Sequence, residues 1–104
     1  MDELDRVEGF DWDEGNARKS AEKHGVSQAE AESMFFSDPL VVVPDPRHSQ
    51  AERRYHALGR TSAGPLLHVV FALRRQETLI RIISARDMHR KERIIYAQET
   101  EAHS

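Results

Sequence analysis

Four arginines follow one another closely in the C-terminal half of the sequence. They are Arg81, Arg86, Arg90 and Arg93. Arg81 lies within the branched apolar run of residues 79–83, which predicts a buried strand, where a guanidinium is costly unless it meets a partner or a wet cleft. Asp87 is expected to cap a short basic helix, and the other three arginines recur at i, i+4 and i+7, which predicts that they share one side of it. This stretch therefore predicts a binding site for a polyanion.

The charge of the chain is distributed unevenly. Residues 1–52 contain 5 Lys and Arg against 13 Asp and Glu, whereas residues 53–104 contain 10 against 5. One face can therefore be basic although the 104-residue chain has a net charge of −3,. The acidic total argues against direct DNA binding by this chain, and no DNA-reading motif is recognisable.

The composition predicts a single small domain. The length of 104 residues, 38% of them hydrophobic, suits one domain with its core at about residues 10–98,. The absence of cysteine excludes disulfides and thiolate metal sites, and the acidic N-terminus is unlike a signal peptide,. We expect a cytoplasmic protein without a membrane segment.

The hydrophobic pattern predicts an α+β fold in the order β-α-α-β-β-β-β-α. The expected strands cover residues 10–12, 40–43, 53–60, 66–73 and 79–86, and the expected helices cover residues 14–24, 27–37 and 88–98. Short connections between the last four strands favour an antiparallel meander, with two N-terminal helices and a C-terminal helix on one side.

Local signals define the ends of the first two helices. Asp13 is expected to cap the first helix and Gly25 to end it. Ser27 and Glu30 have the spacing of a capping box, and Val26 with Ala31 could form the accompanying hydrophobic staple.

The ordered motifs of the chain resemble those of the BrnT toxin family. They are Phe10-Asp11-Trp12-Asp13-Glu14, Lys23-His24-Gly25-Val26-Ser27, Asp38-Pro39, Glu52-x-Arg54-Tyr55 with Gly59, and Arg81-Ile82-Ile83-Ser84-Ala85-Arg86 with Arg90, Glu92, Arg93 and Tyr96. The resemblance implies a RelE-like fold and a ribonuclease toxin of a type II toxin–antitoxin system that inhibits translation. It also implies a BrnA-like antitoxin with a ribbon-helix-helix part, which forms a hetero-oligomer with the toxin and binds operator DNA.

RNA cleavage without a metal or other cofactor needs a base, an acid and cations that stabilise the phosphorane-like charge. The candidates are Lys23, His24, Glu52, Arg54, Arg81 and Arg86, which we expect to line one cleft, with Arg90 and Arg93 as further RNA contacts. His24 can exchange a proton near neutral pH, Lys23 can stabilise an oxyanion or act as a base, and Glu52 is an alternative base. The arginines suit phosphate through their fork geometry.

Structural roles remain open for the same residues. His24 could simply complement a helix dipole, and Glu52 could pair with Arg54 along one strand. His56 and His68 alternate with apolar residues and are expected to be packed or paired, and the spacing of the histidines does not favour a metal site. A protein of this fold could also have lost catalysis and act only as the partner or corepressor of the antitoxin.

Overall fold

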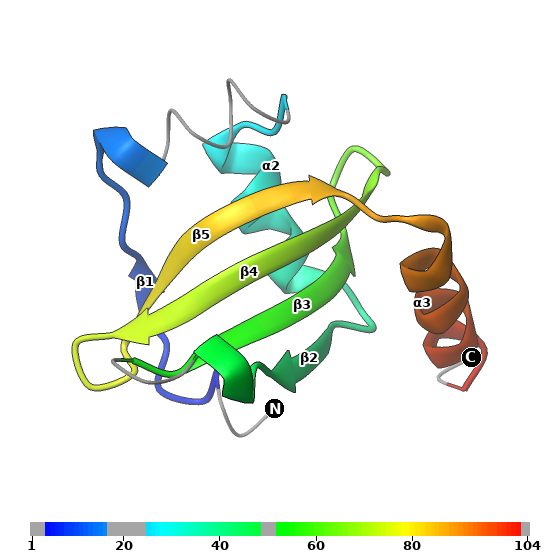
Figure 1. The fold of residues 1–104 in the computed structure, drawn as a ribbon. Coiled ribbons are helices and arrows are strands. Elements are labelled where there is room, and N and C mark those ends of the chain that lie inside the picture. The colour runs from blue at the N-terminus through cyan, green and yellow to red at the C-terminus, as the bar shows by residue number, and fades with distance from the viewer. Residues whose placement is uncertain (1–3, 17–24, 49–51, 103–104) are drawn as a thin grey trace.

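A five-stranded sheet is the centre of the molecule (Figure 1). The computed structural model describes residues 4–16, 25–48 and 52–102. The strands are β1 (Gly9–Phe10), β2 (Val41–Pro44), β3 (Arg54–Arg60), β4 (Leu66–Arg74) and β5 (Leu79–Asp87), and their order in the sheet is β1-β5-β4-β3-β2. The strands from β2 to β5 form the predicted antiparallel meander, whereas β1 pairs with β5 in parallel.

One face of the sheet packs against α2 (Gln28–Ser33) and the 3-10 turn η2 (Met34–Phe36). Val69 and Phe71 of β4 and Ile82 of β5 are fully buried on this face with Met34. In Figure 1, α2 lies behind the sheet. The opposite face, which we call the open face, contacts the C-terminal helix at one end, where Leu58 packs with Tyr96.

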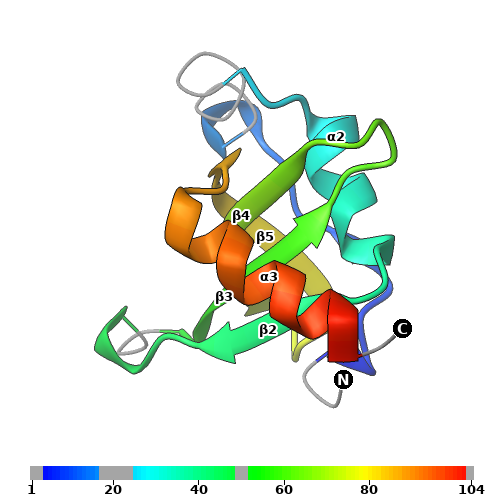
Figure 2. The same cartoon turned by 90° about the vertical axis from the view of Figure 1, so that its right-hand side faces the viewer.

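The C-terminal helix α3 (Arg90–Ala102) crosses one end of the sheet (Figures 1 and 2). The buried side chain that anchors it is Tyr96, which packs with Leu58 and Met88 and donates a hydrogen bond to the Pro39 carbonyl oxygen at 2.7 Å. Two apolar residues of α3 remain exposed, Ile94 at 50% and Ile95 at 46%. The expectation that all helices lie on one side is wrong for α3, which packs at the end of the strands.

The predicted caps at the two N-terminal helices are present. Asp13 Oδ1 accepts a hydrogen bond from the backbone N–H of Asn16, and Asn16 Oδ1 accepts one from the backbone N–H of Asp13. Residues 14–16 are helical. Ser27 and Glu30 form the predicted capping box. The rest of the predicted first helix lies outside the described residues.

The predicted cap at Asp87 is wrong. Asp87 is the last residue of β5, and α3 begins three residues later, at Arg90. The side chain of Glu92 reaches back instead, and its Oε1 accepts from the His89 amide at 2.7 Å. The strand therefore continues further than the sequence pattern indicated, because Asp87 pairs with Leu67 of β4.

Candidate active site

Three basic side chains and one carboxylate meet at the open face of the sheet, near β1. The strand register brings Arg54 and Arg81 together, since Ala72 of β4 pairs with Arg54 of β3 on one side and with Arg81 of β5 on the other. Alternation along β3 and β5 then directs both away from the core of Tyr55 and Ile82,. They line a pocket of about 300 Å³ that also includes Glu52, Arg74, Gly15, Asn16, Ile82 and Ile83.

Arg81 has acidic partners from the chain before the first helix. Its Nη2 donates to Asp13 Oδ2 at 2.8 Å, and its Nη1 lies 3.6 Å from Asp11 Oδ1. Hydrogen bonding to Asn16 and then to Arg81 lowers the pKa of Asp13 below its usual value. The Arg81 side chain is only 19% exposed, and these carboxylates supply the partner that a cation among apolar neighbours requires,.

Glu52 pairs with Arg74 at the other side of the pocket. Arg74 Nε lies 2.7 Å from Glu52 Oε2, and its Nη2 donates to Oε1 at 3.1 Å. The alternative pairing of Glu52 with Arg54 is not the ion pair observed here. The predicted strand ended at residue 73, but β4 continues through Arg74, and residues 75–78 form the turn.

Arg86 does not line this pocket. It forms a two-pronged ion pair with Glu92 of α3, with Nη1 and Nη2 at 2.8 and 2.9 Å from the two carboxylate oxygens. This pairing lowers the pKa of Glu92 to about 2. Because Arg86 belongs to β5 and Arg90 and Arg93 to α3, the three do not share one side of a helix as predicted.

Lys23 and His24 lie outside the described residues. Of the remaining predicted site residues, the structure brings Glu52, Arg54 and Arg81 together, while Arg90 and Arg93 are exposed on α3. Among the described residues no group of three or more His, Cys, Asp or Glu side chains is arranged to hold a metal.

Two histidines on the open face, which were predicted to be packed or paired, are paired with each other. His56 Nδ1 lies 2.8 Å from His68 Nε2, and His56 Nε2 lies 3.0 Å from Asp45 Oδ2. The histidines occupy adjacent antiparallel strands. The register of the predicted β3–β4 hairpin would therefore have shown that their side chains are neighbours.

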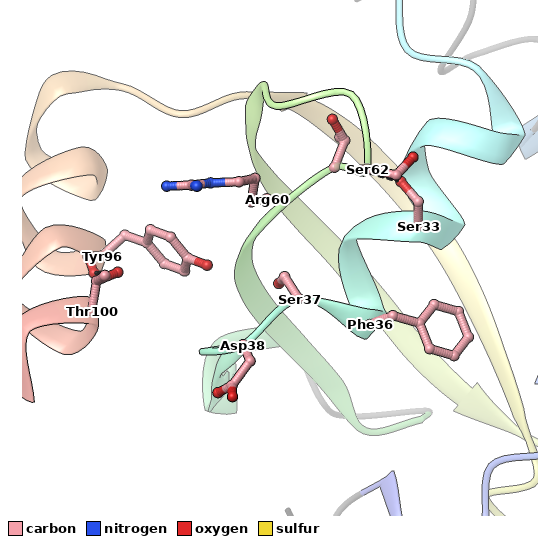
Figure 3. A pocket seen from close by; sticks show the side chains of 9 residues that line it. Ser33, Phe36, Ser37, Asp38, Arg60, Ser62, Tyr96 and Thr100 are labelled. Atoms are coloured by element: carbon pink, nitrogen blue, oxygen red, sulfur yellow. Dashed lines mark hydrogen bonds between the residues drawn. The ribbon is translucent and has the colours of Figure 1, made fainter. Parts of the chain in front are cut away.

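Another hollow lies between α2, β3 and α3 (Figure 3). It has a volume of about 300 Å³ and is lined mainly by hydroxyl side chains, with Arg60 and Asp38 as its charged members. Two of its hydroxyls have structural partners, since Ser37 donates to the Met34 carbonyl oxygen and Tyr96 donates to that of Pro39. Thr61 Oγ1 is buried without a hydrogen-bond partner among the described residues. None of the predicted site residues that the structure describes lines this hollow.

These features belong to a class of small ribonuclease toxins. A family model described as "Ribonuclease toxin, BrnT, of type II toxin-antitoxin system" matches residues 12–92. The chain therefore belongs to the BrnT family of type II toxin–antitoxin systems, which pair a toxin with an antitoxin.

A solved structure shares the fold. The 1.1 Å crystal structure of the Brucella abortus ribonuclease toxin BrnT superposes with a TM-score of 0.60 at 22% sequence identity. The match covers 81% of this chain and 100% of the Brucella chain. No curated protein matches the sequence. No helix among the described residues is long and apolar enough to cross a membrane.

Proposed function

We propose that this chain is an endoribonuclease that inhibits translation in the cytoplasm by cleaving RNA without a metal. The observation that carries the proposal is the convergence of Arg54, Arg74 and Arg81 on one pocket beside the Glu52 carboxylate. Guanidinium groups bind phosphate oxygens in pairs and stabilise the charge that develops when the phosphorus is attacked.

Cleavage in this pocket would proceed by attack of the RNA 2′-oxygen on the adjacent phosphorus. The 2′-hydroxyl proton passes to a base, the 2′-oxygen–phosphorus bond forms, and the 5′-oxygen leaves with a proton from an acid, giving a 2′,3′-cyclic phosphate. Glu52 is the base that the described pocket offers, while Lys23 and His24 are the proposed further proton-transfer or oxyanion groups. Arg54 and Arg81 would hold the phosphate. Arg86, which lies outside this pocket on β5, would contact the RNA elsewhere on the open face, and Arg90 and Arg93 would contact flanking RNA.

The ion pairs of the pocket set a condition on this activity. Arg81 is held by Asp13 and Glu52 is held by Arg74, so an incoming phosphate must compete with Asp13 for the guanidinium. A phosphate group can compete because it accepts the same paired hydrogen bonds as a carboxylate.

The same ion pairs favour a second candidate function. With Arg81, Glu52 and Arg86 each engaged by a partner within the chain, the protein could bind an antitoxin without cleaving RNA. It would then act as the corepressor of a ribbon-helix-helix DNA-binding protein.

We propose a BrnA-like antitoxin as the neutralising partner in either case. The family is one of type II toxin–antitoxin systems, in which an antitoxin is a protein partner of the toxin. An acidic antitoxin segment would match the arginines of the pocket and of α3, and the hetero-oligomer would reach operator DNA only through the antitoxin.

Inducible expression in a bacterial host tests the proposed activity. We expect growth arrest and RNA loss from the wild type, none from Arg81→Ala, and relief of arrest when a BrnA-like antitoxin is co-expressed. Arg53→Ala is the matched control, because Arg53 is exposed next to Arg54 and does not line the pocket. A well-expressed, folded wild type that leaves growth and RNA intact would favour the corepressor.

A further inference from the structure

The paired histidines line a pocket of their own on the open face of the sheet. It has a volume of about 250 Å³ and lies between β2, β3, β4 and α3. We refer to it as the histidine pocket; its lining residues are Val41, Val43, His56, Leu58, His68, Glu92 and Ile95. Four of the seven are aliphatic, so the pocket offers apolar walls with a few polar atoms, as pockets for small planar ligands do.

His68 presents an unpaired ring nitrogen within this pocket. The residue is 8% exposed, and its Nδ1 is buried without a hydrogen-bond partner. A buried polar atom without a partner is costly, so such an atom in a pocket wall points to a group that is supplied from outside.

In one tautomer of the histidine pair, which the proposal adopts, His68 Nδ1 is an acceptor,. The Asp45 carboxylate accepts from His56 Nε2, which leaves His56 Nδ1 as an acceptor for the proton on His68 Nε2,. Burial, followed by the positive charge of Arg86, lowers the pKa of His68 to about 4, so the ring is neutral at pH 7. In this tautomer His68 Nδ1 carries a lone pair and no proton.

Glu92 adds a second acceptor beside the first. Its Oε1 accepts from Arg86 and from the His89 amide, whereas Oε2 accepts from Arg86 alone. A carboxylate oxygen has room for two donors, and this Oε2 lies 4.0 Å from His68 Nδ1,. Two acceptors at this spacing can each accept one hydrogen from a single amino group, because its two N–H bonds point in different directions.

The histidine pocket is close to the arginine pocket. His56 follows Arg54 by two residues on β3, which keeps both on the same face about 7 Å apart along the strand,. A nucleotide adjoining a phosphate held by Arg54 could therefore extend toward the histidine rings. Flat apolar surfaces and imidazole rings suit the face of an unstacked base.

We propose that the histidine pocket binds a nucleobase of the RNA substrate that carries an exocyclic amino group, the amino group donating to His68 Nδ1 and Glu92 Oε2. The inference rests on the proposed function, because it assigns a base preference to the same ribonuclease. Adenine, cytosine and guanine carry such a group and uracil does not, so a uracil would leave acceptors unpaired.

Nucleotide binding to the full chain tests this directly, with CMP and UMP as probes and the histidine ring signals followed by NMR. We expect CMP to shift the His56 and His68 signals and to bind about tenfold more tightly than UMP, since an unpaired buried acceptor is costly. His68→Leu should abolish the preference.

Two surface variants keep the test independent of the folding of His68→Leu. Ile95 lines the pocket and is 46% exposed, so Ile95→Arg should weaken the binding of both nucleotides. Ile94 is 50% exposed on the same helix and does not line the pocket, so Ile94→Arg should bind as the wild type does.

Equal binding of CMP and UMP, or ring signals that do not move, would overturn the proposal. It would also be overturned if Ile95→Arg left nucleotide binding unchanged but weakened antitoxin binding, because the pocket would then be a protein interface. A chain that binds CMP more tightly than UMP but cuts no RNA would support the base-binding pocket and overturn the proposed function. A chain that cuts RNA but binds CMP and UMP equally would support the proposed function and overturn the base-binding pocket.

Discussion

Asp13 caps the first helix and holds the Arg81 guanidinium at 2.8 Å, although the two residues are 68 positions apart in the sequence. The same carboxylate therefore connects the start of a helix to a central arginine of the candidate active site. The ion pair keeps Arg81 in place while RNA is absent, and it must loosen for a phosphate to bind.

Replacing Asp13 by Asn should strengthen RNA binding. Asn keeps the capping oxygen but removes the charge that competes with phosphate, and an exposed ion pair of this kind corresponds to about a threefold change in affinity. Binding to a short RNA, followed by fluorescence anisotropy, measures the effect. Glu8→Gln removes an equal charge from an exposed residue outside this ion pair and should have a smaller effect. Unchanged or weaker binding by Asp13→Asn would show that Asp13 does not compete for Arg81.

Replacing Glu92 by Gln should destabilise the fold. Glu92 accepts hydrogen bonds from both Nη atoms of Arg86 and also accepts from the His89 amide at the start of α3. The change weakens these charge-assisted hydrogen bonds and should lower the free energy of unfolding by about 1–3 kcal/mol. Chemical denaturation gives the free energy of unfolding. Lys91→Gln, at an exposed position of the same helical turn, should leave it almost unchanged. A Glu92→Gln protein as stable as the wild type would contradict this role.

The pH dependence of stability should reveal the burial of His68. Its pKa is lowered to about 4 in the folded chain from 6.5, so the unfolded chain takes up a proton first as the pH falls,. The free energy of unfolding should therefore decrease between pH 6.5 and 4, by roughly 3 kcal/mol from this group. The groups that face His68 are His56, Arg86, His89 and Glu92, and Glu92 keeps its charge over this range because its pKa is about 2.

Denaturation at a series of pH values measures this slope. His68→Leu should flatten the profile between pH 4 and 6.5, and His89→Asn, at an exposed position, should retain it. A wild-type profile without this decrease would mean that His68 titrates normally in the folded chain.

Gly59 should not tolerate a side chain. A Cβ there would lie 2.6 Å from Ser37 Oγ and 2.8 Å from the Met34 carbonyl oxygen, so η2 would have to move away from β3. We expect Gly59→Ala to cost about 1–3 kcal/mol, the usual range for overpacking. Thermal unfolding measures the cost, and Gly9→Ala is the control because a Cβ at Gly9 meets only an ordinary contact at 3.7 Å. Equal melting temperatures for the two variants would contradict the close approach.

The sequence predicted much of the fold because its signals were local. The capping box at Ser27, the cap at Asp13 and the three long strands all follow from side chains within a few residues. The parallel pairing of β1 with β5 had no such signal, because two residues of strand leave little periodicity and the partner is 70 positions away.

The arginine pocket was predicted in part for a similar reason. Arg81 stood out as a cation among apolar strand residues, and Arg54 was named from the family resemblance; the structure places both in one pocket with Glu52. Arg74 was missed, and His56 and His68 were expected only to be packed or paired, because the roles of all three depend on register across strands. Arg86 was grouped with Arg90 and Arg93 because their spacing is helical, whereas Arg86 belongs to β5 and pairs with Glu92 of α3.

Cleavage of RNA by the purified chain tests the central claim most directly. The account predicts that the wild type, freed of antitoxin and supplied with a metal chelator, cuts a single-stranded RNA and leaves 2′,3′-cyclic phosphate ends. Arg53→Ala should retain this activity, and Arg54→Ala and Arg81→Ala should each lose about a hundredfold or more while remaining folded. Equal cleavage by wild type and Arg81→Ala, or none by folded wild type, would contradict the assignment of this pocket as a ribonuclease site.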